Sequence, residues 1–264
     1  MNIFRFEFRQ ALRQTWIWIA AMVFTFAVFL AMYSAVSNDV EGFKSILQAY
    51  PESIQQMLGI NLDAIGSVLG YYAMTFSFLA LVGCIQSATY GFMILSWEQR
   101  EKTGDFLFSK PVSRSRIFWA KTAAMLVNVV LSALLVSLIN YGIFCGGGLQ
   151  GVDFTAYAEM QLILLILMVL FFALGLLLSL VLGKIKRPST YGLSLVFALY
   201  IYSAFFGADS TIKRVFAPFK YFDLFKVIDQ HTLELSWLML SAAFILCLLG
   251  GSYVIYTRQE THLS

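Results

Sequence analysis

Residues 160–183 read MQLILLILMVLFFALGLLLSLVLG, a stretch that contains no Asp, Glu, Lys or Arg. A helix needs roughly 20 apolar residues to cross the hydrocarbon core of a bilayer, and this stretch meets that length. Further charge-free stretches occupy residues 14–38, 64–97, 122–152, 188–208 and 235–257. We therefore expect every charge to lie in an aqueous segment. The fold class that follows is an all-α polytopic membrane protein with six transmembrane helices.

No aqueous segment reaches the size of a soluble domain, so residues 1–264 are expected to form a single transmembrane domain. The stretch 64–97 would be roughly 50 Å long as a helix, more than a bilayer core needs. This span is therefore either tilted or projects at its outer end. Near the ends of other spans, Trp16, Trp18 and Trp237 are expected as anchors at the membrane interface.

The aqueous segments alternate in charge along the chain. The first, third, fifth and seventh hold 13 of the 18 basic residues and 5 of the 15 acidic ones. The other three hold 5 basic and 10 acidic residues. Lys and Arg near span ends stay on the cytoplasmic side, so both termini are expected in the cytoplasm. The basic residues form no patch that indicates nucleic-acid binding.

Residues 1–14 have the pattern of an amphipathic helix that lies on the membrane surface. At 100° per residue, one face is apolar and an adjacent stripe is basic. The alternative is an ordinary positively charged flank of the first span. The residues of the expected interfacial helix are Phe4, Arg5, Phe8, Arg9, Leu12 and Arg13.

The residues that are missing from the spans exclude several classes of function. Ion-coupled transporters and proton relays generally need intramembrane ionisable groups. The two histidines, His231 and His262, lie in aqueous segments, which argues against an intramembrane serine protease and bis-His haem ligation. There is no Gly-x-x-x-x-Gly-Lys phosphate-binding loop, and three scattered cysteines make neither a disulfide framework nor a metal site. We expect no catalytic, cofactor-binding or metal site, so uphill transport would draw its energy from another polypeptide.

The loop between the second and third spans is the most informative aqueous segment. Residues 98–116 read EQREKTGDFLFSKPVSRSR, in which FLF (residues 106–108) is an apolar cluster within a highly charged loop. Such a cluster suggests a docking surface, although a solvated connector is an equal alternative. Ser113 is well placed as the N-cap of the next helix.

This loop resembles that of type-2 ABC exporter permeases: a Glu, a Gly-containing pair, two apolar residues, Pro-Val-Ser-Arg, and a Lys at the start of the third span. The chain departs from the pattern at Asp105, where Thr is commoner. The resemblance extends to the N-terminal helix, which is similar to the family's elbow helix, and to a long outer segment, residues 208–234. It implies that a cytosolic ATPase docks on the loop, through Glu98, Glu101, Gly104, Asp105, Phe106, Leu107, Phe108 and Pro111.

Small and polar residues in two spans are possible helix-interface or cargo contacts. A stripe of small residues in the second span could form a dimer interface, but packing within the subunit is as plausible. Amide side chains within membrane-spanning helices usually form hydrogen bonds with groups on neighbouring helices. Contact with a transported substrate is the alternative role for these residues. The residues are Gly83, Gln86, Ser87, Gly91, Asn128 and Ser132.

Together these features favour the permease subunit of an ATP-driven exporter in the bacterial cytoplasmic membrane, moving an amphipathic peptide, antimicrobial or lipid-like cargo. The resemblance implies a second copy or similar permease and a separate ATPase that binds ATP and Mg. The chain itself would not be an enzyme and would bind no cofactor. The alternative is a non-transporting membrane scaffold or immunity protein that sequesters a peptide or lipid.

Overall fold

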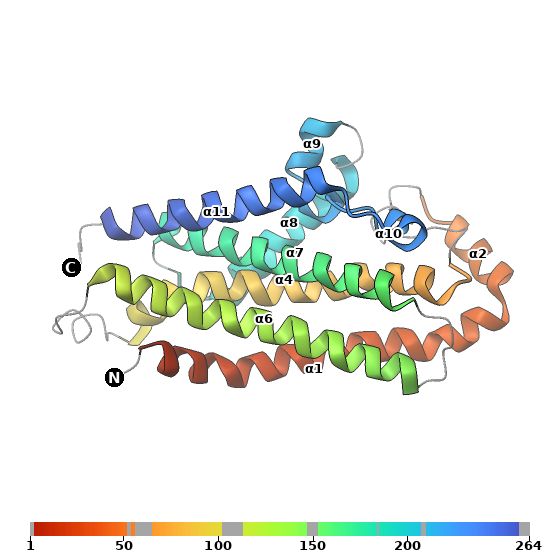
Figure 1. The fold of residues 1–264 in the computed structure, drawn as a ribbon, viewed down its shortest axis with the longest axis horizontal. Coiled ribbons are helices and arrows are strands. Elements are labelled where there is room, and N and C mark those ends of the chain that lie inside the picture. The colour runs from red at the N-terminus through yellow and green to blue at the C-terminus, as the bar shows by residue number, and fades with distance from the viewer. Residues whose placement is uncertain are drawn as a thin grey trace.

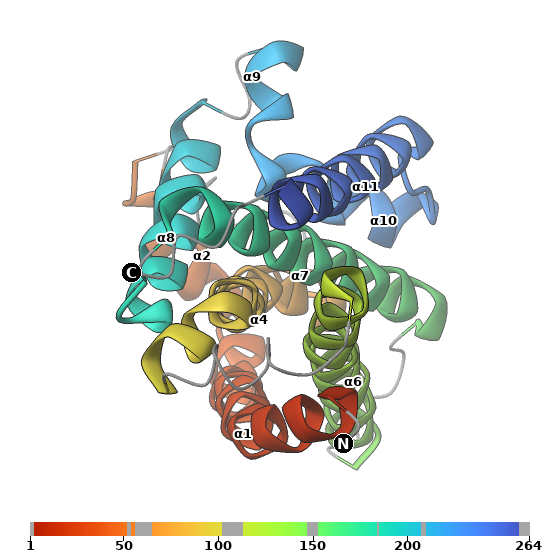
Figure 2. The same cartoon turned by 90° about the vertical axis from the view of Figure 1, so that its left-hand side faces the viewer.

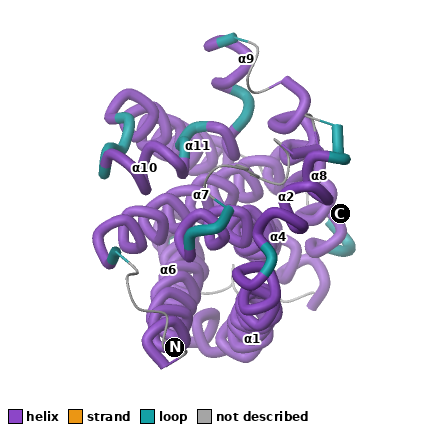
Figure 3. Tube along the Cα trace, turned by 90° about the vertical axis from the view of Figure 1, so that its right-hand side faces the viewer, coloured by secondary structure: helices purple, strands orange, loops and turns teal. Residues whose placement is uncertain are grey.

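The chain forms a bundle of long helices, seen here in a computed structural model (Figure 1). The structure describes residues 3–51, 54–55, 65–101, 113–146, 153–183, 185–206 and 210–258, without the side chains of 34 and 95–101. Within these ranges no strand occurs, as Figure 3 also shows. The elements are α1 (Ile3–Asn38), α2 (Val40–Gln48), α4 (Val68–Glu101), α6 (Arg114–Gly146), α7 (Phe154–Leu182), α8 (Pro188–Phe206), α9 (Thr211–Val215), the 3-10 helix η1 (Pro218–Lys220), α10 (Leu224–Gln230) and α11 (Leu235–Arg258).

Six of the described helices are long and apolar enough to cross a membrane: α1, α4, α6, α7, α8 and α11. Each contains one of the six predicted spans almost entirely, which confirms the predicted fold class. The second span was expected to be tilted or to project at its outer end, and both alternatives stay predictions. Helix α4 begins at Val68, inside the charge-free stretch, and runs past its other end to Glu101. The C-terminal end of α4 therefore carries the first charged residues of the loop.

Helices α4 and α7 form the centre of the bundle. Helix α4 packs against α7 and α8, α1 packs along α6, and α11 packs on α7 (Figure 2). Between α1, α4, α6 and α7, the rings of Phe26, Tyr72, Phe144 and Tyr157 are fully or almost fully buried. Their centroids lie 5.0–5.8 Å apart in edge-on and tilted contacts. This aromatic cluster joins the four helices in the interior.

The short helices α2 and α10 lie toward the end of the bundle away from both chain ends, and α9 projects from its side (Figure 1). Helix α2, which the sequence did not predict, begins at Val40. Its N-cap is Asp39, whose carboxylate accepts a hydrogen bond from the Gly42 backbone N–H at 2.9 Å. The predicted outer segment contains α9, η1 and α10. Ser210 and Asp223 cap α9 and α10 through their side chains. These caps accept hydrogen bonds from backbone N–H groups in the first turn of each helix, which have no partner within the helix itself.

Candidate functional site

The predicted ATPase-docking loop is bracketed by α4 and α6. The backbone of Glu98 and Glu101 belongs to the last turns of α4. Ser113 directly precedes α6, and its carbonyl accepts hydrogen bonds from the N–H groups of Arg116 and Ile117 at 3.0 and 3.2 Å. The remaining predicted docking residues lie outside the described residues, so their role stays a prediction: Gly104, Asp105, Phe106, Leu107, Phe108 and Pro111.

The amphipathic N-terminal segment is the first part of α1, with no break near residue 14. In Figure 2 its first turns run sideways toward α6. Arg5, Arg9 and Arg13 are exposed, and Leu12 is half-buried. The half-buried rings of Phe4 and Phe8 stack with centroids 6.0 Å apart. The basic stripe is thus free to face an aqueous or headgroup region, and contact of this segment with a membrane surface stays a prediction.

The face of α1 that is buried in the protein carries Glu7, Ala11 and Thr15, spaced one turn apart. Glu7 forms an ion pair with Lys121 of α6, with Oε1 and Nζ 3.1 Å apart. Their side chains retain only 10% and 4% of their accessible surface. The expectation that every charge lies in an aqueous segment is therefore wrong for these two residues. Each charge is tolerated in the bundle because the other compensates it.

A buried group of hydrogen bonds lies two turns farther along α1. The Thr15 hydroxyl donates to Asn128 Oδ1 of α6 at 2.9 Å and lies 2.8 Å from the Tyr90 hydroxyl of α4. The Asn128 amide in turn donates to the carbonyls of Ala124 and Phe8 at 2.9 and 3.4 Å. This polar cluster, together with the Glu7–Lys121 pair, connects α1 to both helices that flank the predicted docking loop.

The stripe of small residues on α4 packs within the subunit. A Cβ atom added at Gly91 would lie 2.6 Å from the backbone nitrogen of Leu176 on α7, and one at Gly175 would lie 2.5 Å from the Ala88 carbonyl oxygen. At Gly83 an added Cβ would meet the Met168 sulfur at 3.0 Å. Close helix approach of this kind depends on small side chains. Here it joins α4 to α7 at their centre.

The other polar candidates lie within the bundle as well. Gln86 and Ser87 are fully buried on α4, and Ser132 is fully buried on α6, where its hydroxyl donates to the Val129 carbonyl at 2.8 Å. Asn128 belongs to the polar cluster between α1 and α6. The structure therefore brings Asn128 together with Thr15 and Tyr90, a grouping that spacing along one helix could not reveal.

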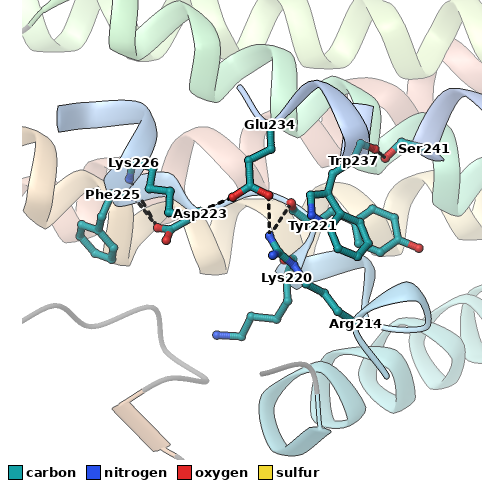
Figure 4. A network of polar contacts seen from close by, with 9 residues as sticks. All are labelled: Arg214, Lys220, Tyr221, Asp223, Phe225, Lys226, Glu234, Trp237 and Ser241. Atoms are coloured by element: carbon teal, nitrogen blue, oxygen red, sulfur yellow. Dashed lines mark hydrogen bonds and ion pairs between the residues drawn. The ribbon is translucent and has the colours of Figure 1, made fainter. Parts of the chain in front are cut away.

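In the outer segment, Glu234 is the centre of a charge network (Figure 4). Its carboxylate lies 3.4 Å from the Arg214 guanidinium and 3.0 Å from Lys226 Nζ. Arg214 also donates to the carbonyls of Lys220 and Tyr221 at 2.7 and 2.9 Å. The hydrogen bond from Lys226 holds the pKa of Glu234 below its ordinary value. These contacts fold the segment back onto the start of α11.

Trp237 supports this network from α11. The Arg214 guanidinium lies 4.4 Å from its ring centroid, and the Tyr221 ring stacks on it at 5.2 Å. Trp237 is 8% exposed, so the expectation that it anchors the chain at the membrane interface is wrong. Charged residues of both signs gather near the start of the last span in the sequence: Arg214, Lys220, Lys226 and Glu234. This grouping is a signal that could have predicted the packing of the outer segment on Trp237.

The model for the family described as "ABC-2 family transporter protein" matches residues 1–260. Neither the curated proteins nor the solved structures gave a match. The six apolar helices of the described residues agree with a multi-pass membrane component of an ABC transporter. Because the match covers nearly the whole chain, the protein belongs to the ABC-2 family of transporter membrane proteins.

Proposed function

We propose that this chain is the permease subunit of an ATP-driven exporter in the cytoplasmic membrane. A separate cytosolic subunit would bind ATP and Mg and hydrolyse the nucleotide, and a second permease copy would complete the pathway. Family membership supports the permease role. The apolar cluster of residues 106–108 in the loop between α4 and α6 supports docking of the ATPase there.

The observation that carries this proposal is the buried connection between the helices around the loop. A force applied between the end of α4 and the start of α6 acts on two helices that are both held to α1. The Glu7–Lys121 pair holds α6 to α1, and the contact between the Thr15 and Tyr90 hydroxyls holds α4 to it. Because α4 is packed closely on α7 through Gly91, the same force reaches the centre of the bundle. Packed elements with two discrete arrangements transmit such a force over a distance.

An amphipathic cargo fits the composition of the spans. Residues 160–183 and the other five stretches lack Asp, Glu, Lys and Arg, so a pathway between two copies would be lined by apolar and neutral polar groups. Such a lining suits a peptide or lipid-like molecule better than an ion. Export, rather than import, follows from the resemblance of the loop to exporter permeases.

The test is the double substitution Phe106→Ala with Phe108→Ala. Fully burying one such side chain contributes roughly 1.5–3 kcal/mol, so loss of two should weaken ATPase association by at least a decade. We expect normal membrane levels of the permease, less co-purified ATPase and no cargo-stimulated ATP hydrolysis. Val112→Ala, an apolar truncation in the same loop, is the matched control and should retain both. If the double variant also retains both, the loop is a solvated connector and the scaffold alternative is favoured.

A further inference from the structure

A cavity of about 540 Å³ lies between the outer segment and the helices α4, α7 and α8. This volume is within the range of small-molecule sites, roughly 300–1,000 Å³. The three helices form the inner wall, and the outer segment covers the opposite side. The apolar part of the lining includes Phe76, Ala80, Ile163, Leu167, Tyr200 and Phe219.

The cover of the cavity is packed onto the helices beneath it. The Phe219 ring of η1 lies with its centroid 5.2 Å from that of Phe171 on α7 and 5.2 Å from that of Tyr200 on α8. Aromatic contacts at this separation are favourable. The cavity therefore lies between packed elements, and a largely apolar cavity of this kind suits a hydrocarbon chain.

The charged groups of the lining already interact within the protein. Arg214 and Lys226 lie 3.4 and 3.0 Å from the carboxylate of Glu234. The Asp223 carboxylate accepts hydrogen bonds from the first backbone N–H groups of α10 at 3.1 and 3.5 Å. Burial lowers the pKa of Lys220, whereas the attraction of the Asp223 carboxylate raises it. A charged head group would compete with these contacts, so the lining favours an uncharged one.

One polar group of the lining has no such contact. Ser203 of α8 is 1% exposed, and its hydroxyl has no hydrogen-bond partner within the described part of the chain. Other buried serines in the long helices donate to carbonyls of their own helix, as Ser179 does at 2.7 Å. Buried polar groups normally have a partner, so Ser203 is available to a polar group that enters the cavity.

We propose that this cavity binds an uncharged single-chain amphiphile whose head group carries a hydroxyl. The alkyl chain lies against Phe76, Leu167 and Tyr200, and the head hydroxyl forms a hydrogen bond with Ser203. Two hydroxyls can pair in either direction, because each is both a donor and an acceptor. Binding requires neither an ATPase nor a second permease copy. The inference therefore goes beyond the proposed transport function, and its test does not depend on that function.

The experiment is photo-crosslinking of the purified full-length protein in lipid nanodiscs. The probe is a dodecanol analogue that carries a diazirine in its chain, and unlabelled molecules compete with it at equal mole fractions in the bilayer. We expect crosslinked peptides from the cavity-lining parts of α4, α7 and α8. Dodecanol should compete about tenfold better than dodecane, a difference equivalent to about 1.4 kcal/mol, because only dodecanol can pair with the buried hydroxyl.

Two further competitors define the head group. Dodecyl phosphate has the same chain with a charged head, and it should compete at least tenfold more weakly than dodecanol. Monolauroylglycerol has an acyl chain of the same length with an uncharged, hydroxyl-bearing head, and it distinguishes the source of the ligand. Stronger competition than that of dodecanol assigns a membrane glyceride, and weaker competition assigns a simple fatty alcohol.

Two variants test the two parts of the site. Ser203→Ala should abolish the preference for dodecanol over dodecane, and its matched control, Ser179→Ala, should retain that preference because Ser179 lies outside the lining. Ala204→Leu should reduce crosslinking by filling part of the cavity, which Ala204 lines. Its control is Ala198→Leu, at an exposed position of the same helix, which should leave crosslinking unchanged.

Three results would each overturn the proposal. The first is equal competition by dodecanol and dodecane in the wild type. The second is an undiminished preference for dodecanol in Ser203→Ala, a mild truncation that leaves the fold intact. The third is stronger competition by dodecyl phosphate than by dodecanol, which would show that a charged head group is favoured.

Discussion

Removing one partner of the buried Glu7–Lys121 pair should destabilise the protein strongly. At 3.1 Å, two unit charges attract each other by about 5 kcal/mol at an effective dielectric constant of about 20. Both side chains are nearly inaccessible to solvent, so Lys121→Met leaves the Glu7 carboxylate buried without its counter-charge. Breaking a buried pair in this way costs roughly 3–5 kcal/mol. We expect Lys121→Met to lower the free energy of unfolding by that amount.

The double substitution Glu7→Met with Lys121→Met should recover most of this loss. Replacing both charges with apolar side chains of similar length removes the desolvation cost together with the attraction. The assay is unfolding in mixed micelles of increasing SDS content, followed by tryptophan fluorescence. The two single variants, the double variant and the wild type form a double-mutant cycle, and the coupling free energy should exceed about 2 kcal/mol.

Arg13→Met is the matched control, because Arg13 is an exposed cation on the same helix. Its effect should stay within about 0.5 kcal/mol, as for most surface substitutions. The reasoning fails if Lys121→Met is as mild as this control. It also fails if the effects of the two single variants simply add in the double variant, because the two charges would then not compensate each other.

Three further predictions address the packing, the outer segment and the topology. Gly91→Ala should destabilise the protein by about 1–3 kcal/mol, because its new Cβ would meet the backbone of α7. Gly250→Ala is the control and should not destabilise the protein, because a Cβ there would have nothing within 4 Å. Thermal unfolding of the two variants measures the difference. Because the pKa of Glu234 is lowered from 4.5, its ionised form stabilises the outer segment above pH 4.5, and this contribution is lost as the pH falls through the lowered value. Proteolysis of the segment by pepsin should therefore increase with falling pH more steeply in the wild type than in Glu234→Gln, and equal steepness would contradict the role of this carboxylate. In a cysteine-free background, Ser113→Cys should react with a membrane-impermeant thiol reagent only from the cytoplasm and Ser210→Cys only from outside; the opposite pattern would reverse the predicted orientation.

The long helices could be predicted from the sequence because the bilayer sets their length and excludes charge from their interior. The small stripe around Gly91 was also visible, but its partner was not, since close approach on α7 depends on the three-dimensional arrangement. The Glu7–Lys121 pair was missed for a related reason. Charges near span ends look like ordinary flanking residues, and nothing in their spacing shows that α1 and α6 lie side by side there.

The charge network around Glu234 could not be predicted from the sequence for the same reason. Arg214 and Glu234 are separated by 20 positions, and only the folding back of the intervening chain brings them within 3.4 Å. Trp237 was read as an interfacial residue because tryptophans at span ends usually are. Its actual partners, Arg214 and Tyr221, come from a segment whose short helices lack the long periodicity that sequence patterns detect.

The central position of α4 has a consequence for the biogenesis of the protein. Its apolar part, Val68–Ile94, is less hydrophobic than α7, and it carries the buried polar residues Gln86 and Ser87. The helices that enclose it most closely, α7 and α8, are synthesised later. A nascent α4 must therefore enter the bilayer before the protein surroundings that suit it exist. Membrane integration of this helix should therefore depend on the insertion machinery, and truncated chains that end before α7 should retain α4 poorly in the membrane.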